Sequence, residues 1–461
     1  MNSREGLIEK LTRLLGPECV ATDPSQLEEH SWDALSESRI HPLRRPASTF
    51  PLCVVFPATT AGVREVVLLA NEEKVPIIPY GAGSGLMGGA ISLQPGIVVD
   101  LRRMNRVLQI DKDAQTAQVQ AGLVLESLEK RLNEKGLILG HDPWTLPVAT
   151  IGGAMSTNSL GYRGGKYGSM GDQVLGLEVV LPRGEILRTR SVPRSSTGVS
   201  LRHLFIGGEG CFGIITEATL RVFPLPGKRF LQAFRFSSFE AGFGAVKEIF
   251  AAGVRPALMD FGDDSAKVDG GVVLYLALEG MREIVEAEEG VALRICDREG
   301  GERLPRDEAE RFWRERHIVA YHFMRNRRRR REGGGDAFRR DWIHVALPTS
   351  QVLRFREEAM RILARRGLVL QESGLWTQPE LFSMRVAASN GQSDPSVLED
   401  TVEELLRLVQ KMGGSMEYCH GVGVKLAPLM AEEHGYGLEV MRQIKKALDP
   451  QNLMNPGKMG L

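Results

Sequence analysis

The feature that most constrains this chain is a glycine-rich stretch at residues 79–89, which reads Pro-Tyr-Gly-Ala-Gly-Ser-Gly-Leu-Met-Gly-Gly. Glycine allows a positive φ and close approach to a ligand, because it has no Cβ. Successive backbone N–H groups in such turns form concave sites that bind phosphate oxygens. The stretch contains no Lys or Arg, so an anion bound there would be held by backbone dipoles. The competing interpretation is a tight loop between two strands.

The spacing of these glycines helps to distinguish between several phosphate-binding folds. Gly83, Gly85 and Gly88 match G-x-G-x-x-G, which is a weak indication when it stands alone. In a Rossmann fold this motif leads directly into a helix. Residues 86–96 have no helical apolar stripe and lead instead into a strand-like segment at 97–100. A P-loop is excluded because no Gly-Lys-Ser/Thr follows. The stretch therefore predicts phosphate binding in a strand–loop–strand setting.

Composition narrows the class of protein further. The 461 residues predict about two or three domains. Lys and Arg total 58, as do Asp and Glu, so we expect neither nucleic acid nor an anionic membrane as the main partner. The five cysteines are scattered without a C-x-x-C pair, which excludes the usual cysteine zinc and iron–sulfur spacings and favours a reducing compartment. The polar N-terminus and the lack of a long apolar run predict no secretory signal, no membrane span and a cytoplasmic location.

The first half of the chain alternates helical and strand-like patterns. Periodicity predicts helices at 6–15, 61–74 and 124–135, and strands at 53–56, 75–78, 97–101, 106–111 and 116–120. Two further glycine-rich regions follow, at 140–171 and 206–217. Long loops of this kind are usually functional or disordered, and the apolar residues within 140–171 argue against disorder. Three such loops separated by strands predict an extended ligand, for which a dinucleotide fits better than a mononucleotide.

The composition changes near 225–227, where we place a domain boundary. Beyond it, patterns predict strands around 230–236, 272–278, 343–347 and 383–387, and helices at 239–252, 282–290, 306–320, 350–366 and 395–412. This is the pattern of an α+β domain. The basic run Arg325–Arg331 is interpreted as a solvated loop, because the chain has zero net charge and no aromatic residues interrupt the run.

Four segments together resemble the flavoproteins of the vanillyl-alcohol oxidase/p-cresol methylhydroxylase (PCMH-type) family. The similarity lies in Pro79-x-Gly81-x-Gly83-Ser84, Thr150-Ile151-Gly152-Gly153, Gly208-Glu209-Gly210-x-x-Gly213-Ile214-Ile215-Thr216 and the segment 448–458. Their order and spacing agree over nearly the whole chain. Two branches look nearest, the glycolate oxidase/D-lactate dehydrogenase branch and the alkyldihydroxyacetonephosphate synthase branch.

The resemblance implies an α+β fold in three parts. A two-subdomain, PCMH-type FAD-binding domain is expected at 1–225, an α+β substrate-binding cap at 226–423, and a segment returning to the FAD domain at 424–461. The residues expected to bind FAD are Pro79, Tyr80, Gly81, Ala82, Gly83, Ser84, Gly85, Pro143, Thr150, Gly152, Gly153, Ser156, Asn158, Glu209, Gly210, Gly213, Ile214, Ile215 and Asn455.

Departures from the family pattern are informative. Some relatives bind FAD covalently through a histidine in the first loop and a cysteine in the second; this chain has Ser84 and no cysteine in 140–155, so non-covalent FAD is expected. Metal-dependent hydroxy-acid dehydrogenases of the family carry Gly-Asp-Gly-Asn-x-His and Glu-His-Gly. Both are missing here and Cys419 replaces the glutamate, so no metal is expected. The synthase branch has three successive histidines where this chain has Tyr418-Cys419-His420.

These comparisons lead to one expected reaction. We expect an FAD-dependent oxidoreductase that dehydrogenates a small 2-hydroxy acid, similar to glycolate or D-lactate, by hydride transfer to flavin N5. His420 is the candidate base, since an unperturbed imidazole is largely neutral at pH 7. Arg385 is the candidate for binding a carboxylate, with Arg316 and Arg325 as weaker alternatives. Tyr418 is a candidate hydrogen-bond donor to the substrate.

Two alternatives remain open at this level. One is an alkyldihydroxyacetonephosphate synthase-like flavoenzyme, and the other is the flavin subunit of a larger oxidase complex. The resemblance leaves the electron acceptor open, and it is compatible with a homodimer or with a partner subunit.

Overall fold

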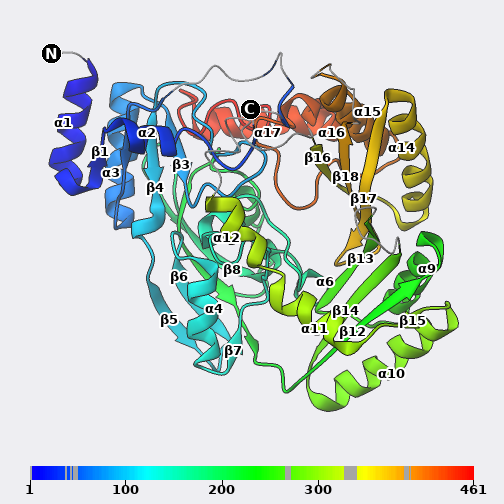
Figure 1. Cartoon of the computed structure of the whole chain (residues 1–461). Helices are drawn as coiled ribbons and strands as arrows, with labels where there is room; N and C mark the ends of the chain where they lie inside the picture. Colours follow the sequence, from blue (N-terminus) through cyan, green and yellow to red (C-terminus); the bar gives the residue numbers. More distant parts are fainter. Residues whose placement is uncertain are drawn as a thin grey trace.

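The computed structural model describes residues 3–36, 39–41, 44, 50–264, 271–325, 340–388, 394 and 396–461. Figure 1 shows an N-terminal half with several small sheets and a second half organised around one large sheet. This two-part α+β arrangement confirms the predicted fold class. Of the basic run at 325–331, only Arg325 lies within the described residues.

The glycine stretch 79–89 leaves a small, mainly parallel sheet. The strands follow the order β1-β2-β4-β3, in which β2, β4 and β3 are parallel and β1 is antiparallel to β2. The stretch joins β3 to β4, so the predicted strand–loop–strand setting is confirmed. The elements of this unit are α1 (Ser3–Leu15), η1 (Pro17–Cys19), β1 (Val20–Ala21), α2 (Pro24–Glu29), β2 (Cys53–Val55), α3 (Thr60–Glu73), β3 (Ile77–Tyr80), β4 (Ile97–Asp100) and η4 (Leu101–Arg103).

A second, antiparallel sheet follows with the strand order β5-β6-β10-β8-β9, and a short pair, β7 and β11, lies beside it. Every residue of β8 is buried. This strand is therefore part of the core of the N-terminal half, which is called the FAD half below because an FAD-binding domain is expected there. The elements are β5 (Val107–Asp111), β6 (Thr116–Gln120), α4 (Leu125–Asn133), β7 (Leu137–Ile138), α5 (Ile151–Ser156), α6 (Gly164–Tyr167), α7 (Met170–Gln173), β8 (Val174–Val180), β9 (Ile186–Arg188), α8 (Arg202–Phe205), β10 (Ile214–Arg221) and β11 (Phe223–Pro224).

The second half contains a seven-stranded antiparallel sheet with the order β15-β12-β14-β13-β17-β18-β16. Helices α9, α10, α14 and α15 pack on its outer face, and α11 packs on β12 and β14. The elements are β12 (Lys228–Phe236), α9 (Phe239–Ala251), β13 (Leu258–Asp264), β14 (Val272–Gly280), α10 (Arg282–Arg298), β15 (Glu302–Arg303), α11 (Arg306–Glu315), α12 (Ile318–Arg325), β16 (Arg340–Ala346), η5 (Thr349–Gln351), α14 (Val352–Arg366), β17 (Leu368–Trp376), β18 (Leu381–Ala388) and α15 (Val397–Lys411).

The sequence patterns missed three strands of this sheet and misjudged two helices. Strands β13, β15 and β17 were not predicted. Strand β15 has only two residues, and β13 and β17 carry polar or glycine residues on the face that looks toward the FAD half. Helix α10 is longer than predicted. The helix predicted at 306–320 is split into α11 and α12, because Arg316 and His317 at the break turn inward to bind Asp142.

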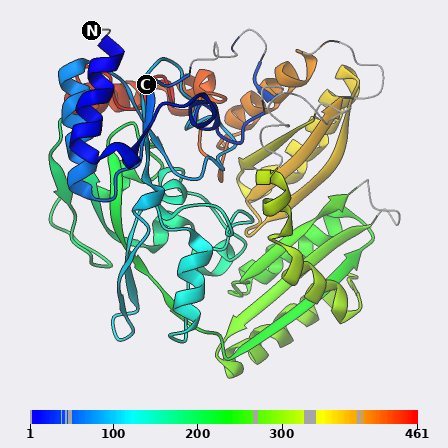
Figure 2. The same ribbon diagram turned by 60° about the vertical axis from the view of Figure 1, so that its left-hand side comes forward.

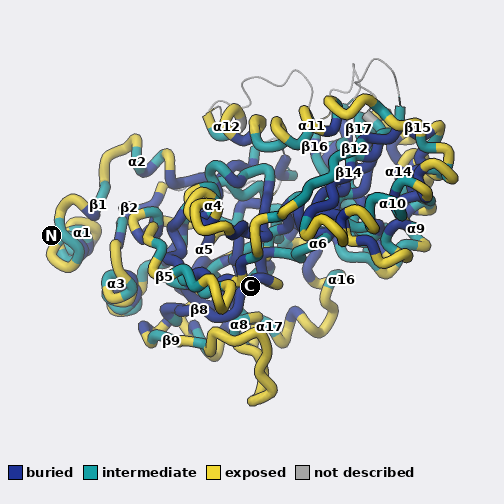
Figure 3. Tube along the Cα trace, turned by 90° about the horizontal axis from the view of Figure 1, so that it is seen from below, coloured by how far each residue is buried: buried dark blue, intermediate teal, exposed yellow. Residues whose placement is uncertain are grey.

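The last segment returns to the first sheet. Elements η6 (Ala427–Leu429), α16 (Met430–His434) and α17 (Tyr436–Leu448) lead back across the FAD half, as Figures 1 and 2 show. The N–H of Ile77 in β3 donates to the carbonyl of Leu453 (2.7 Å), and the N–H of Asn455 donates to the carbonyl of Ile77 (2.8 Å). In Figure 3 the strands form the buried interior and the outer helical turns are exposed.

Candidate functional site

Two adjoining cavities lie where the FAD half faces the large sheet. The first cavity is lined mainly by the three glycine-rich loops, and the second is lined mainly by β13, β16, β17 and β18. Trp144, Cys419 and His420 line both. These three side chains therefore form the boundary between the two cavities.

The first cavity collects most of the residues that the sequence predicted for the cofactor. The predicted residues that line it are Pro79, Tyr80, Gly81, Ala82, Gly83, Ser84, Gly85, Pro143, Thr150, Gly152, Gly153, Ser156, Glu209, Gly210, Gly213, Ile214 and Ile215. Three loops that lie far apart in the sequence thus meet on one surface.

The geometry of the first loop fits a pyrophosphate held by backbone groups. Gly83 and Gly88 have φ values of 61° and 83°, a region that favours glycine. A Cβ on Gly81 would lie closer than 3.0 Å to the hydroxyl of Thr150, which caps the N-terminus of α5. None of the described residues that line the cavity is Lys or Arg. Backbone N–H groups are therefore the groups suited to hold a phosphate here.

Two predicted cofactor residues do not line the first cavity. The Asn158 side chain is exposed, and its Oδ1 accepts the N–H of Gly171 (2.9 Å), which holds a turn. The Asn455 side chain is buried, and its Nδ2 donates to the carbonyls of Gly89 (2.9 Å) and Glu209 (2.7 Å). Asn455 thus ties the returning segment to two glycine loops rather than facing the cavity.

Glu209 connects the third glycine loop to the segment that carries His420. Its carboxylate is buried and accepts the N–H of Val422 (2.5 Å) and of Gly423 (2.9 Å). Gly421 and Gly423 have φ values of 82° and 53°, so the turn depends on glycine. Burial raises the pKa of Glu209 to about 7, although the two backbone N–H groups oppose the shift.

The residues 415–425 bridge the large sheet and the first glycine loop. At one end, Ser415 pairs with Ala346 at the end of β16, with an N–H to carbonyl distance of 2.8 Å. At the other end, the N–H groups of Val424 and Lys425 donate to the carbonyl of Met87 at 3.0 and 3.1 Å. His420 lies between these two anchors, which explains its position at the boundary of both cavities.

The second cavity lies over one face of the large sheet. Side chains two residues apart on a strand point to the same face, and Gly374 pairs with Gly262 on one neighbouring strand and with Ser383 on the other. Ser383 in turn pairs with His344. This row lies between two bulkier rows on the same face, namely Asp260 with Trp376, and Glu372 with Arg385 and Trp342. Its glycines let the strands approach closely, because a Cβ on Gly262 or Gly374 would lie closer than 3.0 Å to a carbonyl oxygen of the adjacent strand.

Arg385 and Tyr418, predicted to bind the substrate, line the second cavity together with His420. A guanidinium nitrogen of Arg385 lies 3.4 Å from a carboxylate oxygen of Glu372. The other two candidate arginines lie elsewhere. Arg316 donates to Asp142 (2.9 Å), and Arg325 is exposed beside His322.

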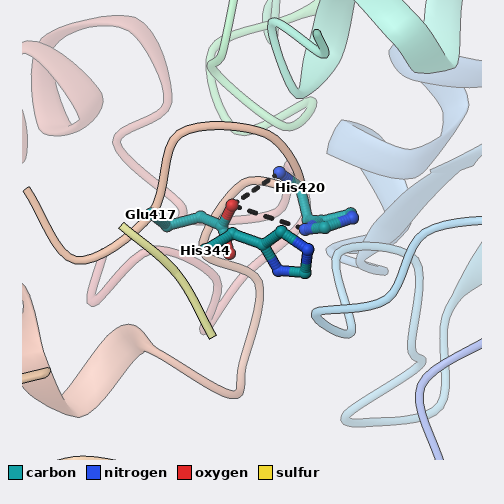
Figure 4. A group of neighbouring side chains, drawn as sticks. All are labelled: His344, Glu417 and His420. Carbon is teal, nitrogen blue, oxygen red and sulfur yellow. Dashed lines mark hydrogen bonds and ion pairs between the residues drawn. The ribbon is translucent and has the colours of Figure 1, made fainter. Parts of the chain in front are cut away.

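His420 forms a cluster with Glu417 and His344 (Figure 4). The Oε1 atom of Glu417 accepts the backbone N–H groups of Tyr418 (3.0 Å), Cys419 (2.7 Å) and His420 (3.0 Å). The same oxygen lies 3.4 Å from His420 Nδ1. The rings of His344 and His420 meet edge to face, with centroids 4.5 Å apart. Glu417 thus both shapes the turn and forms an ion pair with His420.

The pKa values of the two imidazoles are shifted in opposite directions. Burial alone would lower the pKa of His420, but Cys419 and Glu417 raise it to about 10. Burial and the neighbouring His420 lower the pKa of His344 to about 3. At neutral pH His420 is therefore an imidazolium and His344 is neutral. This differs from the sequence-based expectation of a largely neutral His420, which did not include the ion pair with Glu417.

The same cluster has a donor set that could hold a metal ion. Within the described parts of the chain, ligand atoms of His344, Glu417 and His420 lie within 4.8 Å of one another. Two imidazoles and a carboxylate suit several divalent transition metals. The expectation of no metal rested on the missing family motifs, and neither Glu417 nor His344 belongs to such a motif.

A buried ion cluster beside the second cavity joins the FAD half to the half that contains the large sheet. Asp142 binds Arg316 (2.9 Å) and His317 (2.7 Å), and Arg163 lies 4.0 Å away. These cations hold the pKa of Asp142 well below its usual range, although burial acts in the opposite direction. Tyr162 from the FAD half packs edge to face on Trp376 of β17, with ring centroids 5.3 Å apart. The walls of the second cavity are thereby fixed from both halves.

Several residues of the second cavity were not predicted. They are Tyr162, Asp260, Trp342, His344, Glu372, Trp376, Ser383, Met384 and Cys419. Most stand singly on strands without a recognisable motif. The one available indication was the alternation of polar and apolar residues along 340–346 and 381–388, which shows that polar side chains share one face of each strand.

Comparison with known proteins agrees with this geometry. Residues 51–190 match the FAD binding domain family, and residues 225–459 match the family of FAD linked oxidases, C-terminal domain. The chain therefore belongs to the FAD-linked oxidases of the PCMH type, and it is an FAD-dependent oxidoreductase. No helix among the described residues is long and apolar enough to cross a membrane.

Individual relatives fall into the branches expected from the sequence. The chain is 28% identical over 466 residues to glycolate oxidase subunit GlcD of Bacillus subtilis, covering 98% of this chain and 96% of the relative. It is 30% identical over 474 residues to a probable mitochondrial D-lactate dehydrogenase of Danio rerio, covering 99% and 92%.

Two solved structures share the fold. The structure of an alkyldihydroxyacetonephosphate synthase matches with a TM-score of 0.79 at 21% identity, covering 98% of this chain and 85% of that chain. The structure of p-cresol methylhydroxylase with substrate bound matches with a TM-score of 0.79 at 20% identity, covering 100% and 97%.

Proposed function

We propose that this flavoprotein oxidises a 2-hydroxy acid to the corresponding 2-oxo acid. The observation that carries the proposal is the second cavity, which adjoins the cofactor cavity and presents the cationic side chains Arg385 and His420. A 2-hydroxy acid brings a carboxylate and a neighbouring hydroxyl group, which two cations that line one cavity can bind. Two relatives, a glycolate oxidase subunit and a probable D-lactate dehydrogenase, point in the same direction.

The cofactor is held by the three glycine loops without a covalent bond. Ser84 offers no imidazole, and backbone groups of the loop 79–89 are the expected pyrophosphate ligands. Bound FAD supplies the acceptor for the two electrons that leave the substrate carbon as a hydride. All other steps of the reaction fall to the side chains around His420.

The two histidines receive different roles in this proposal. Groups whose environments push their pKa values apart are candidates for acid and base roles. The His420 imidazolium holds the negative charge of the substrate carboxylate or of the developing alkoxide, and Arg385 holds the carboxylate with its planar fork. His344 is neutral and takes the proton of the hydroxyl group. Tyr418 supplies a further hydrogen bond in the second cavity.

The cluster needs no metal ion in this scheme. The negative charge of Glu417 is already balanced by the His420 imidazolium and by the three backbone N–H groups that its Oε1 accepts. A divalent cation bound to the cluster would displace the His420 proton. The family motifs for a metal are also missing from the sequence.

The proposal is tested by mixing the purified holoenzyme anaerobically with a panel of 2-hydroxy acids and following the loss of flavin absorbance. Reduction by at least one 2-hydroxy acid, but not by the matching primary alcohol without a carboxylate, is the expected result. A flavin that stays oxidised with every hydroxy acid would overturn the proposal. Reduction or adduct formation with an acylated glycerone phosphate would favour the synthase-like alternative.

A second candidate role concerns the electron acceptor. One relative is named a glycolate oxidase subunit, so this chain is a candidate flavin subunit of a larger oxidase. The test is reoxidation of the substrate-reduced flavin by oxygen and by soluble dyes. Fast reoxidation by either in the isolated chain argues for an independent enzyme, and reoxidation only with copurified proteins argues for a subunit.

A further inference from the structure

The second cavity is larger than a glycolate or lactate molecule requires. Its volume is about 200 Å³. For comparison, an apolar cavity of about 150 Å³ in another protein binds a benzene ring. The hydrogen of glycolate or the methyl group of lactate would leave most of this space to water. The size of the cavity therefore indicates a substrate with a ring-sized side chain.

The walls of the cavity are aromatic and held in place. Trp144, Trp342 and Trp376 line it, together with Tyr162. The Trp376 ring is fixed by its edge-to-face contact with Tyr162 at 5.3 Å. The Trp342 ring carries the guanidinium groups of Arg39 and Arg340 at 5.8 and 5.5 Å from its centroid. Such fixed aromatic surfaces suit a flat ring, since aromatic pairs attract one another beyond the burial of their area.

The charged groups of the cavity lie at two separate ends. Asp260 on β13 pairs with Trp376 on β17, and Arg385 on β18 pairs with Glu372 on β17. Asp260 and Arg385 are therefore two strands apart, and their partners are four residues apart along β17. With strands about 4.8 Å apart and about 3.3 Å per residue, their Cα atoms are roughly 16 Å apart. Asp260 thus stands at the opposite end of this face from Arg385. A carboxylate accepts hydrogen bonds only, so Asp260 suits a donor at the far end of a longer substrate.

We infer that the substrate is a 2-hydroxy acid whose side chain is an aromatic ring carrying a hydroxyl group. The inference rests on the proposed function and names its substrate class. The 2-hydroxy acid end lies at Arg385 and His420, the ring lies between the indole walls, and the ring hydroxyl donates to Asp260.

The experiment uses the FAD-loaded enzyme in anaerobic stopped-flow mixing with both enantiomers of lactate, phenyllactate and 4-hydroxyphenyllactate. The second-order rate of flavin reduction is expected to be at least about 100-fold higher for phenyllactate than for lactate, and higher again for the hydroxylated ring. Lactate reducing the flavin as fast as phenyllactate would overturn the inference and leave the proposed function intact. No reduction by any of these acids or by glycolate would overturn both.

Variants locate the effect in the cavity. Trp376→Leu is expected to lower the ratio of phenyllactate to lactate rates at least about tenfold. Tyr436→Leu, which removes an exposed ring far from the cavity lining, is the control, and its ratio should stay that of the wild type. Asp260→Ala removes the acceptor and is expected to reduce the advantage of the hydroxylated ring over the plain ring. A wild-type ratio in Trp376→Leu, or a wild-type hydroxyl preference in Asp260→Ala, would contradict the inference.

Discussion

The two cavities are built in different ways. The first is made mainly of backbone, from three loops in which consecutive glycines leave room for a ligand. The second is made mainly of side chains, which stand singly on four strands and on the bridge at residues 415–425. A site made of backbone tolerates few substitutions, because a Cβ added at Gly81, Gly152, Gly210 or Gly213 would lie closer than 3.0 Å to a neighbouring residue. A site made of side chains can exchange them one at a time, and with them its substrate.

The largest effect is expected at Gly423, where backbone meets backbone. A Cβ on Gly423 would lie closer than 3.0 Å to the carbonyl oxygen of Met87, and φ is 53°. Gly423→Ala should separate the bridge from the first loop and yield protein without bound FAD, since overpacking and backbone strain together cost several kcal/mol. The measurement is the flavin absorbance of the purified protein.

Gly367→Ala is the matched control for that variant. Gly367 has a similar φ of 67°, but nothing lies within 4 Å of the position of its Cβ. The free energy of unfolding of Gly367→Ala should fall by only about 1 kcal/mol, and this variant should keep its FAD. Equal flavin loss in both variants would show that strain at positive φ, rather than contact between the bridge and the loop, decides FAD binding.

The second largest effect is expected at His420, whose side chain lies at the boundary between the two cavities. His420→Asn should lower the rate of flavin reduction about 10²–10³-fold, the usual effect of removing one group that stabilises developing negative charge, while the FAD content stays close to that of the wild type. Because the folded pKa is about 10, the positive charge is present below that pH and is lost as the pH rises through it. Substrate should therefore bind more weakly above pH 10 in the wild type.

His322→Asn, an exposed change on α12, is the control for His420→Asn. It should reduce flavin at the wild-type rate. If the His420 variant kept the wild-type rate and the same loss of substrate affinity above pH 10, the charge would have to lie on another group.

A third prediction concerns Glu209, the buried carboxylate of the first cavity. Its pKa of about 7 lies above its usual 4.5, so between these pH values the native state holds a proton that the unfolded chain releases. Stability should therefore fall as the pH rises from 4.5 to 7. At about 1.4 kcal/mol per pKa unit, this loss is about 3 kcal/mol.

Glu209→Gln should lack that loss, since the amide stays neutral throughout. The measurement is denaturant unfolding of both proteins at pH 5 and pH 7.5. The stability of the variant relative to the wild type should increase with pH, and a constant difference would argue that Glu209 is ionised in the native state at both pH values.

A smaller effect is expected at Arg385. Arg385→Lys keeps the charge but loses the planar fork that binds a carboxylate through two hydrogen bonds. The dissociation constant of the substrate should rise about tenfold, with a smaller change in the rate of flavin reduction. The measurement is the substrate dependence of flavin reduction, with Arg361→Lys on the exposed face of α14 as control. A larger effect on the rate than on the affinity would place Arg385 in the chemical step.

No effect is expected from the removal of metal ions. After dialysis against a strong chelator, the enzyme should contain substoichiometric metal and reduce its flavin at the original rate. This follows if the His420 proton balances Glu417. Loss of activity that returns with one equivalent of a divalent metal would show that His344, Glu417 and His420 act as ligands.

The contrast between the cavities also explains what the sequence could predict. The loop 79–89 and the motifs around Thr150 and Glu209 are contiguous, so their glycine spacing was sufficient to predict the first cavity. The second cavity depends on pairings such as His344 with Ser383 and Asp260 with Trp376, which join residues up to 116 positions apart. No local pattern encodes that register.

Two residues predicted to contact the cofactor have partners within the protein. Asn158 and Asn455 belong to glycine-rich or turn segments. Both amides bind backbone groups of neighbouring loops, because buried or turn-forming main chain needs partners as much as a ligand does. The protonation of His420 escaped prediction because the ion pair depends on a turn at Glu417.

The return of residues 453–458 to strand β3 has a consequence for biosynthesis. Asn455 closes the gap between two glycine loops, and Lys458 donates to the carbonyl of Ile91 (2.8 Å) behind the first loop. Most of the FAD half is translated first. Its loops are therefore joined only after residue 458 has been synthesised. During synthesis the nascent chain exposes an unfinished cofactor site while the whole cap is being made, so FAD capture is a late event on the ribosome or follows release.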